Sequence, residues 1–431
     1  MNNTTEQQHQ IAERVARGLK RRYRAERRFR LYGILSIAFG LLAVLVLFTD
    51  IISKGAGAFR QTYVQLTLQY DADVLGISDI NDERQLALAD YQGVINQALY
   101  ERFPQYSSRK DKRELKKVIS NGEGYEIRDR LVANPSLLNQ SETLWLVTDD
   151  DVDTYYKSIG DDDGAFTGRV SETIQSVVGE LIDSGDIDLR LNVNFFTRGD
   201  SREPEQAGIW GAAVGSFFTL LITLALSFPI GVAAAIYLEE FAPRNRWTDI
   251  IEVNINNLAA VPSIIFGLLG LAIFINFFGI PRSVPIVGGL VLTLMTLPTI
   301  IISSRAAIKA VPPSIREAAI GIGASPMQVV MHHVLPLAMP GMLTGAIIGM
   351  AQALGETAPL LMIGMVAFIV DIPSGPASPA TVLPVQIFLW ADSPERAFVE
   401  KTSAAIMVLL TFLIIMNASA VWLRKRLERR W

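Results

Sequence analysis

Six stretches of the chain are apolar and long enough to cross a lipid bilayer. They lie near residues 32–52, 209–237, 256–279, 285–304, 340–368 and 403–423. A helix needs about 20 apolar residues to span the hydrocarbon core of a membrane. Because that core offers no hydrogen-bonding partners, such segments fold as helices whose backbone groups bond to one another. The sequence therefore predicts an all-α polytopic membrane protein with six transmembrane helices.

The composition excludes several kinds of functional site from this chain. Half of its 431 residues are hydrophobic, it has no cysteine, and it has three histidines. Disulfides and thiolate-ligated metals are therefore excluded, and a histidine-rich metal site is not expected. The phosphate-cradling pattern G-x-x-x-x-G-K-[ST] does not occur, so the chain does not bind ATP through such a loop. We expect no catalytic residue, no metal site and no cofactor in this chain.

Basic residues gather at the two ends of the chain. Nine Lys/Arg precede the first apolar stretch, and five follow the last one. Lys and Arg are retained on the cytoplasmic side of membrane proteins, and an even number of spans places both ends there. The sequence predicts basic cytoplasmic tails at 1–30 and 424–431, with 31–52 as an uncleaved first transmembrane helix. A basic cluster beside an apolar span indicates retention in the cytoplasm and contact with membrane lipid, so no nucleic-acid partner is expected.

Residues 53–206 form a polar insertion between the first two spans. The insertion carries 17 Lys/Arg and 28 Asp/Glu, and acidic residues do not hinder export across a membrane. Apolar and polar residues alternate over 64–70 and over 189–195, which predicts two strands with one buried face each. Helical stretches are predicted near 81–102, 110–132 and 171–183, the last capped by Ser171. We expect an extracytoplasmic α+β domain whose terminal strands pair near the membrane.

Two runs of three aspartates in the insertion raise the possibility of a calcium site. They lie at 149–151 and 161–163. Neither run, counted from its first aspartate, has the glycine at the sixth position that an EF-hand loop requires. The interpretation we favour is a solvated loop or the beginning of a helix.

A polar loop at 305–338 separates the fourth and fifth spans. Within it, residues 317–319 are expected to begin a short helix that Gly323 breaks. Ser325 has the side chain of an N-cap and Pro326 suits the first turn of a helix, so a second short helix follows. The loop is thus predicted to present a helix–turn–helix outside the membrane.

This loop resembles the EAA motif of importer-type ABC-transporter permeases. That motif reads E-A-A, three residues, G, nine residues, an aliphatic residue, one residue and L-P. The residues in register are Glu317, Ala318, Ala319, Gly323, Leu335 and Pro336. The aliphatic position holds His333, which departs from the pattern. The resemblance implies that the loop docks in a cleft of a cytoplasmic ATPase and transmits the closure of that ATPase to the membrane helices.

Glu356 is an ionisable residue about halfway along the predicted fifth span. A carboxylate at that depth costs several kcal/mol unless it is paired, protonated or hydrated. Gly355 and Pro359 flank it, which favours an irregular helix with available backbone groups. Glu356 is therefore a candidate for lining or gating a substrate path. The alternative is a structural carboxylate bonded to another helix.

Residues 355–361 resemble the G-E-T-A-P-L-L signature of phosphate ABC-transporter permeases, most closely their A-type subunits. The segments 231–240 and 259–268 resemble two further strings of that family. The resemblance implies a type I ABC-importer permease core with five helices over 207–423.

Two departures concern the path of the substrate. The family usually carries Arg three residues before G-E-T, where this chain has Gln352, and it often carries R-T-T-E where this chain has 302–305. A dianion needs cations or helix N-termini along its route. The candidate path residues are Glu356, Thr357, Arg305 and Gln352, with Arg305 as the candidate cation.

The resemblance also implies partners and a location. The expected substrate is inorganic phosphate, and the expected partners are a second permease subunit, two ATP-binding subunits that hold ATP and magnesium, and an extracytoplasmic phosphate-binding protein. The location would be the bacterial inner membrane. Two alternatives stay open: a permease for another oxyanion such as sulfate or molybdate, and a membrane sensor with an outer ligand domain.

Overall fold

The computed structural model describes residues 2–80, 82–159 and 170–427, and it divides the chain into two units. The first unit, residues 1–54, consists of helix α1 (Asn2–Gly55). This helix carries both the basic segment and the first apolar span without a break. Apolar side chains between Leu31 and Leu47 are exposed along it.

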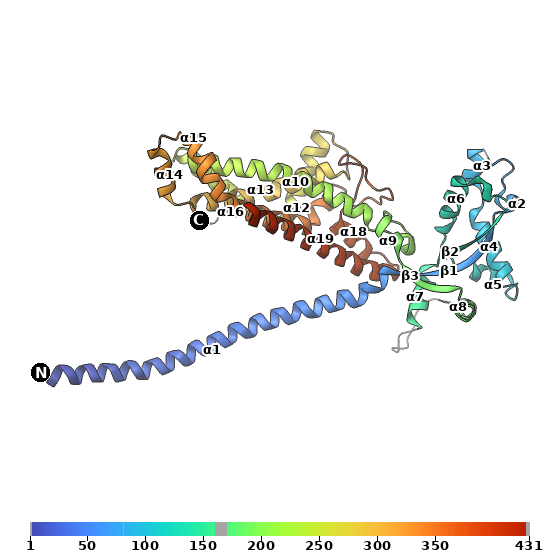
Figure 1. Cartoon of the computed structure of the whole chain (residues 1–431), viewed down its shortest axis with the longest axis horizontal. Helices are drawn as coiled ribbons and strands as arrows, with labels where there is room; N and C mark the ends of the chain where they lie inside the picture. Colours follow the sequence, from blue (N-terminus) through green and yellow to red (C-terminus); the bar gives the residue numbers. More distant parts are fainter. Residues whose placement is uncertain (1, 81, 160–169, 428–431) are drawn as a thin grey trace. The chain divides into compact units, whose positions relative to one another are not determined.

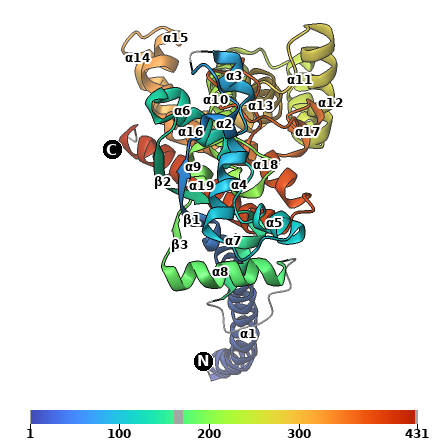
Figure 2. The same ribbon diagram turned by 90° about the vertical axis from the view of Figure 1, so that its right-hand side faces the viewer.

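The second unit, residues 55–431, begins with the insertion (Figure 2). Its sheet has three antiparallel strands in the order β2-β1-β3. They are β1 (Arg60–Gln69), β2 (Ser141–Val147) and β3 (Ile187–Leu191). Val64, Leu66 and Leu68 of β1 are buried in the core of the insertion, so the first predicted alternation is confirmed. The terminal strands β1 and β3 pair as predicted, and β2 is a strand that the pattern did not reveal.

Helices of the insertion surround this sheet. They are α2 (Ala72–Leu75), α3 (Glu83–Leu88), α4 (Tyr91–Arg102), α5 (Arg109–Leu115), α6 (Glu123–Ala133), α7 (Asp150–Ser158), α8 (Glu172–Ser184) and α9 (Val193–Thr197), with 3-10 turns η1 (Ala56–Phe59), η2 (Pro135–Leu137) and η3 (Pro204–Gln206). Ser171 caps α8 as predicted. The predicted strand at 189–195 is wrong beyond Leu191, because the Asn192 side chain accepts a hydrogen bond from the backbone N–H of Phe195 and starts α9. Asp149 caps α7 in the same way, which confirms the helix-start interpretation of the first aspartate run; the second run lies outside the described residues.

Four long helices make up most of the membrane bundle of the second unit (Figure 1). They are α10 (Trp210–Ile236), which continues into the π-helical turn η4 (Tyr237–Phe241), α13 (Pro285–Lys309), α16 (Leu335–Gly355) and α19 (Ala397–Leu427). Together with α1, five helices among the described residues are long and apolar enough to cross a membrane, or six if one bent pair counts as a span. The short helix α18 (Leu383–Ala391) precedes α19 and was not predicted.

The bent pair replaces the predicted third span at 256–279. Helix α11 (Arg246–Ala259) ends before Pro262, and α12 (Ser263–Gly270) continues into the π-helical η5 (Leu271–Phe277) after a bend of 102°. The residue before a proline is disfavoured in helical conformation, which explains the break.

The predicted fifth span at 340–368 is displaced toward the N-terminus. A continuous helical segment runs over 326–355 and stops at Gly355. The π-helical turn η6 (Val329–Val334) precedes Pro336, and such local adjustment allows prolines inside a helix. The ring of Pro359 would clash with the carbonyl of Gly355 in a continued helix, so the helix ends before Glu356. A separate short helix, α17 (Ala358–Met362), follows.

Candidate functional site

The loop with the E-A-A pattern folds as an elbow of two short helices at one end of the bundle (Figure 1). Helix α14 (Pro313–Gly321) is followed by α15 (Pro326–Gln328), which leads into η6. Gly323 turns the chain with a φ of +92°, a conformation that favours glycine. The Ser325 hydroxyl accepts a hydrogen bond from the backbone N–H of Gln328, whose side chain accepts one from the backbone N–H of Ser325. The predicted helix–turn–helix and its cap are present, although α14 begins at Pro313 and not at Glu317.

The elbow has a buried side and an exposed side. Ala319 is 3% exposed and packs in an apolar cluster with Val311, Val329, Val334 and Met342. Glu317 and Ala318 are exposed, while Leu335 and Pro336 are half-buried. The exposed side also carries large apolar side chains, which are Ile320, Ile322 and Met327. Exposed apolar side chains gathered beside polar ones are typical of a surface that binds another protein.

Ion pairs fix the base of the elbow to the neighbouring helices. The Arg316 guanidinium binds Glu240 at 2.8 Å and donates to the backbone carbonyls of Ile308 and Val311 at 3.0 and 2.7 Å. An arginine that donates to carbonyls in the last turn of α13 and just after it satisfies groups that the helix end leaves unpaired. Sequence reasoning noted the string that ends at Glu240 but did not assign this role to its carboxylate.

Arg305 lies in the same group of charges, near the elbow end of α13. Its guanidinium binds Glu252 at 2.5 Å and Glu239 at 3.4 Å, and its side chain is 14% exposed. Lys309 also reaches Glu239, at 3.4 Å. The candidate cation is thus held by two carboxylates at the base of the elbow.

The break after α16 brings together the other candidate path residues. Gln352 is exposed in the last turn of α16, Glu356 is half-buried with extended backbone, and Thr357 begins α17. Within the described residues, the Glu356 carboxylate has no hydrogen-bond or ion-pair partner. The predicted irregular backbone at Glu356 is confirmed. Its predicted position halfway along a span is wrong, because Glu356 follows Gly355, the last residue of α16.

Arg305 is remote from this break along the bundle. Helices α13 and α16 are antiparallel and meet at small residues, with Gly341 against Ala307 and Gly345 against Ser303. Small residues allow close packing of membrane helices. Gly345 is therefore nearly level with Arg305, and Glu356 lies 11 residues further along, roughly 17 Å at the rise of an α-helix. The structure joins Gln352, Glu356 and Thr357 but not Arg305.

Two segments with family-like strings pack against each other at the break. A Cβ atom on Gly267 of α12 would lie 2.7 Å from the backbone of Pro359 in α17, so only glycine fits there. The string around the α11–α12 bend and the string around Glu356 thus form one packed unit.

Comparisons with known proteins agree with these strings. The family described as "Binding-protein-dependent transport system inner membrane component" matches residues 227–431, and a "Domain of unknown function (DUF3333)" matches residues 16–165. The phosphate transport system permease protein PstA of Haemophilus influenzae is 30% identical over 227 residues, which cover 53% of this chain and 79% of that protein. The chain belongs to the bacterial phosphate transport permease family. The predicted resemblance is therefore confirmed for the membrane half.

The matches to other relatives of this permease cover different shares of the length of those proteins. The PstA 1 protein of Mycobacterium tuberculosis strain H37Rv is 28% identical over 229 residues, 53% of this chain and 73% of that protein. The probable ABC transporter permease protein YqgI of Bacillus subtilis is 35% identical over 172 residues, so the match spans only 58% of YqgI and 40% of this chain. These relatives are transport permeases, and this permease is a multi-pass inner membrane protein with a transport role, not an enzyme.

A solved structure of the MetNI methionine ABC transporter in an inward-facing conformation is 20% identical to this permease. It covers 51% of this chain and 98% of that one, with a TM-score of 0.43.

Proposed function

We propose that this permease is the membrane-spanning subunit of an ATP-driven, binding-protein-dependent importer of inorganic phosphate. The observation that carries the proposal is the combination of two features on one bundle: the capped elbow with an exposed Glu317 before α16, and the helix break with the G-E-T-A-P-L-L string after α16. The similarity to PstA supports phosphate as the substrate. The bundle is then a type I ABC-importer permease core with an extracytoplasmic α+β insertion.

The elbow is the proposed coupling element. In this proposal Glu317, Ala318 and the exposed apolar side chains enter a cleft of a separate ATP-binding subunit, which holds ATP and magnesium. The elbow and both basic tails then face the cytoplasm, as the distribution of Lys and Arg favours. The complete importer would contain two ATP-binding subunits, a second permease subunit and an extracytoplasmic phosphate-binding protein.

The break after α16 is the proposed substrate path. Glu356, Thr357 and Gln352 bring a carboxylate, a hydroxyl and an amide to backbone that is not helical, and such backbone is tolerated in a membrane where it lines a cavity. Arg305 would meet phosphate only where the path reaches the elbow end, because two carboxylates already hold its guanidinium.

The cavity beside the sheet of the insertion is an unsuitable site for phosphate itself. A cavity of about 730 Å³ beside the sheet is lined by Glu123, Glu126 and Asp129, and its Arg130 and Arg198 already bind Glu126. Carboxylates repel a dianion, so the proposed path runs through the bundle and not through this cavity.

Uptake of radiolabelled phosphate at micromolar supply tests the proposal. Cells that lack this chain and have no second high-affinity system should lose uptake, and the wild-type chain should restore it. A chain carrying Glu317→Lys is the matched control, because it should insert in the membrane without restoring uptake. Unchanged high-affinity uptake in the deletion strain would overturn the assignment.

A second candidate is an importer of another oxyanion such as sulfate or molybdate. Gln352 stands where an arginine is usual, and the charge of Arg305 is already neutralised, which favours testing this candidate. Competition decides between the two: excess unlabelled phosphate should abolish uptake of the label, and excess sulfate or molybdate should not. The alternative of a membrane sensor predicts that the chain purifies without any ATP-binding subunit.

A further inference from the structure

The insertion meets the membrane helices along a tightly packed seam. Apolar residues from both sides form one buried cluster, in which Ala58 and Phe195 of the insertion, and Ala207 directly after it, pack with Trp390 and Phe398 of the bundle. The strand β1 begins directly after η1, and its first residues are Arg60 and Gln61. The insertion therefore continues into the bundle through packed structure at both of its ends.

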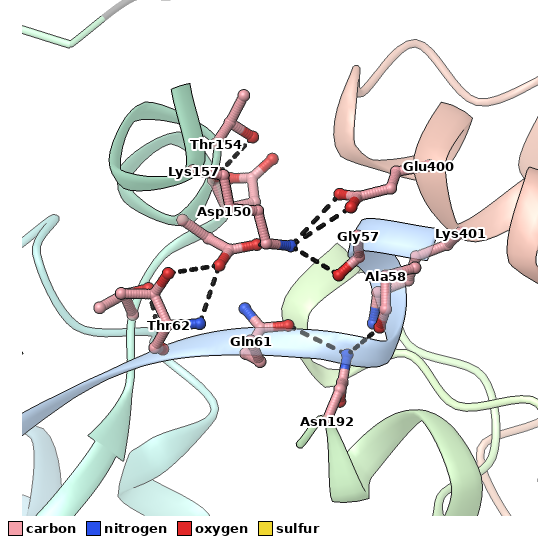
Figure 3. Close-up of polar contacts among 12 residues, drawn as sticks. Gly57, Ala58, Gln61, Thr62, Asp150, Thr154, Lys157, Asn192, Glu400 and Lys401 are labelled. Atoms are coloured by element: carbon pink, nitrogen blue, oxygen red, sulfur yellow. Dashed lines mark hydrogen bonds and ion pairs between the residues drawn. The ribbon is translucent and has the colours of Figure 1, made fainter. Parts of the chain in front are cut away.

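Lys157 of α7 joins the first end of the insertion to α19 (Figure 3). Its ammonium group binds the Glu400 carboxylate of α19 at 3.4 Å and donates to the backbone carbonyl of Gly57 at 3.1 Å. It also binds Asp153 at 2.8 Å. One lysine thus contacts three separate segments of the chain.

Asp153 extends this contact into the sheet. Its carboxylate accepts hydrogen bonds from the backbone N–H and the hydroxyl of Thr62 in β1, at 2.8 and 2.6 Å. Asp153 is 6% exposed and Thr62 is fully buried. Lys157 is therefore linked through Asp153 to the central strand β1, and the hydrogen bonds of this link are shielded from water.

Lys401, the next residue of α19, joins the last end of the insertion. Its ammonium group donates to the backbone carbonyl of Ala207 at 2.8 Å and lies 5.8 Å from the centre of the Phe195 ring. Lys401 is 4% exposed. Consecutive residues of one helical turn, Glu400 and Lys401, thus hold the two ends of the insertion.

A buried lysine is a poor device for stability alone. Removing charges from water costs several kcal/mol per ion, and apolar residues of similar volume usually serve a core as well or better. Buried ionic groups do fix one arrangement of the parts, since any other arrangement leaves a charge unpaired. The seam uses one such lysine, Lys401, together with Lys157, whose side chain is 18% exposed, and the two reach across it from opposite sides.

We propose that Lys157 and Lys401 are positioning residues that fasten the insertion to the first turn of α19. The insertion and this turn of α19 then move as one body, so that displacement of α19 during transport is carried outward into the insertion. The fastening of the insertion to α19 does not depend on the proposed transport function. Only the expected behaviour on addition of ATP rests on that function.

Distances between spin labels test whether the insertion and α19 form one rigid body. The chain has no cysteine, so Lys110→Cys on α5 and Ile414→Cys on α19, both exposed, create two unique labelling sites. In the complete transporter reconstituted in lipid, the distance distribution between the labels should be narrow and should keep its mean when ATP is added. A broad distribution in the wild type, or an ATP-dependent change of its mean, would overturn the proposal without involving any variant of the seam.

Variants of the seam test the two lysines. Lys157→Met and Lys401→Met should each broaden the distribution at least twofold, whereas Lys117→Met, which removes only a surface pair with Glu114, should not. Lys157→Arg, which keeps the positive charge beside Asp153 and Glu400, should keep the distribution narrow. Unchanged distributions in both lysine variants would contradict the positioning role.

The ratio of substrate uptake to ATP hydrolysis is a measurement that a purely structural role of Lys401 would not change. Lys401→Met should lower substrate uptake at least fivefold while the ATPase rate of the assembled transporter stays within twofold of wild type. Equal loss of both would show a structural role only and would overturn the proposal. If the wild-type complex hydrolyses ATP but takes up no phosphate, the proposed substrate fails, and the label distances still decide the inference.

Discussion

The bundle has a charge cluster at each end, and the two clusters differ in burial. The elbow cluster joins Arg305, Lys309 and Arg316 to three glutamates, and its side chains range from 14% to 59% exposed. The seam cluster comprises Lys157, Asp153, Glu400 and Lys401 together with Glu205, which lines the same small cavity. Lys401 and Glu205 are 4% and 2% exposed, whereas the side chains of Lys157 and Glu400 are 18% and 27% exposed. Exposed ion pairs are weak because water and salt screen them, whereas a buried charge that loses its partner costs several kcal/mol.

This difference suits two mechanical tasks. The weaker, partly exposed ion pairs at the elbow can break and form again with other partners when a neighbouring subunit closes and opens. Buried charges at the seam keep one arrangement, since every other arrangement is costly. We therefore expect substitutions at the elbow to change coupling and substitutions at the seam to change stability and rigidity.

The largest expected effect concerns the surface of the elbow. Glu317→Lys should lower transport about 100-fold or more, because it reverses a charge at the centre of the proposed docking surface, where few residues contribute most of the binding energy. The chain should still insert, since Glu317 is exposed and lies outside the bundle. Transport assays with a membrane-fraction blot measure both quantities. Glu101→Lys, an exposed charge reversal on α4, is the control, and wild-type uptake by the Glu317 variant would refute docking through this surface.

The same contrast explains how much the sequence could predict. The elbow depends on local rules, since Ser325, Pro326 and Gly323 fix a cap and a turn through their own chemistry, and the apolar periodicity of α10 and α13 is set by the bilayer. The seam depends on residues far apart in the chain. Nothing in the neighbourhood of Lys157 indicates that Glu400 lies beside it, and a lysine near the start of a span is expected at the membrane surface, not in a core.

Errors in the predicted elements also have local physical causes. The fifth span was misplaced because Leu335 and Pro336 were interpreted as the end of the elbow, whereas the π-helical turn before Pro336 lets the helix continue. The strand at 189–195 was overextended because alternation cannot reveal that the Asn192 side chain caps a helix. Arg305 is a candidate path cation by its charge and by its place in the string at 302–305, and the sequence could not reveal its partners Glu239 and Glu252, which come from other helices.

The next expected effect is a pH dependence of the seam. Burial, followed by the charges of Asp150 and Glu203, raises the pKa of Glu205 to about 7 from its ordinary value of 4.5. Its carboxylate accepts a hydrogen bond from Ser120, and its second oxygen is buried without a partner among the described residues. The folded state therefore holds a proton that the unfolded state releases. Stability should fall as pH rises from 4.5 to 7 and level off above, by up to about 3 kcal/mol for this residue.

Glu205→Gln tests this dependence, because the amide cannot release a proton. Thermal unfolding in detergent at pH 5, 6, 7 and 8, followed by tryptophan fluorescence, should show a shallower decline in the variant than in the wild type. Part of the decline should persist, because burial also raises the pKa of Glu123 to about 7. Glu101→Gln on the exposed side of α4 is the control. A wild-type stability that rises over this pH range would contradict the buried, protonated state.

A smaller effect is expected between the clusters, at the helix break. Glu356→Gln should lower transport about tenfold, which corresponds to about 1.4 kcal/mol, because it removes the charge but keeps the shape and hydrogen-bonding capacity of the side chain. Assembly should be unchanged, since the carboxylate has no partner within the described residues. Uptake by purified, reconstituted complexes measures the effect. Normal uptake would assign Glu356 to structure instead of the path, and Gln352→Glu, four residues earlier, shows whether charge at this break is what matters.

The smallest expected effect returns to the base of the elbow. Glu240→Gln removes the carboxylate that Arg316 binds at 2.8 Å, but Arg316 keeps its two bonds to the carbonyls of Ile308 and Val311. A partly exposed ion pair contributes roughly 0.5–1 kcal/mol, so transport should fall only about two- to fivefold. Raising the ionic strength should weaken the wild-type pair and bring its uptake closer to that of the variant. For Glu205→Gln, at the buried seam, raising the ionic strength should not change the difference in uptake between the variant and the wild type. If Glu240→Gln were as severe as Glu317→Lys, the elbow would be rigidly clamped at its base, and the contrast between an exchangeable elbow cluster and a fixed seam cluster would fail.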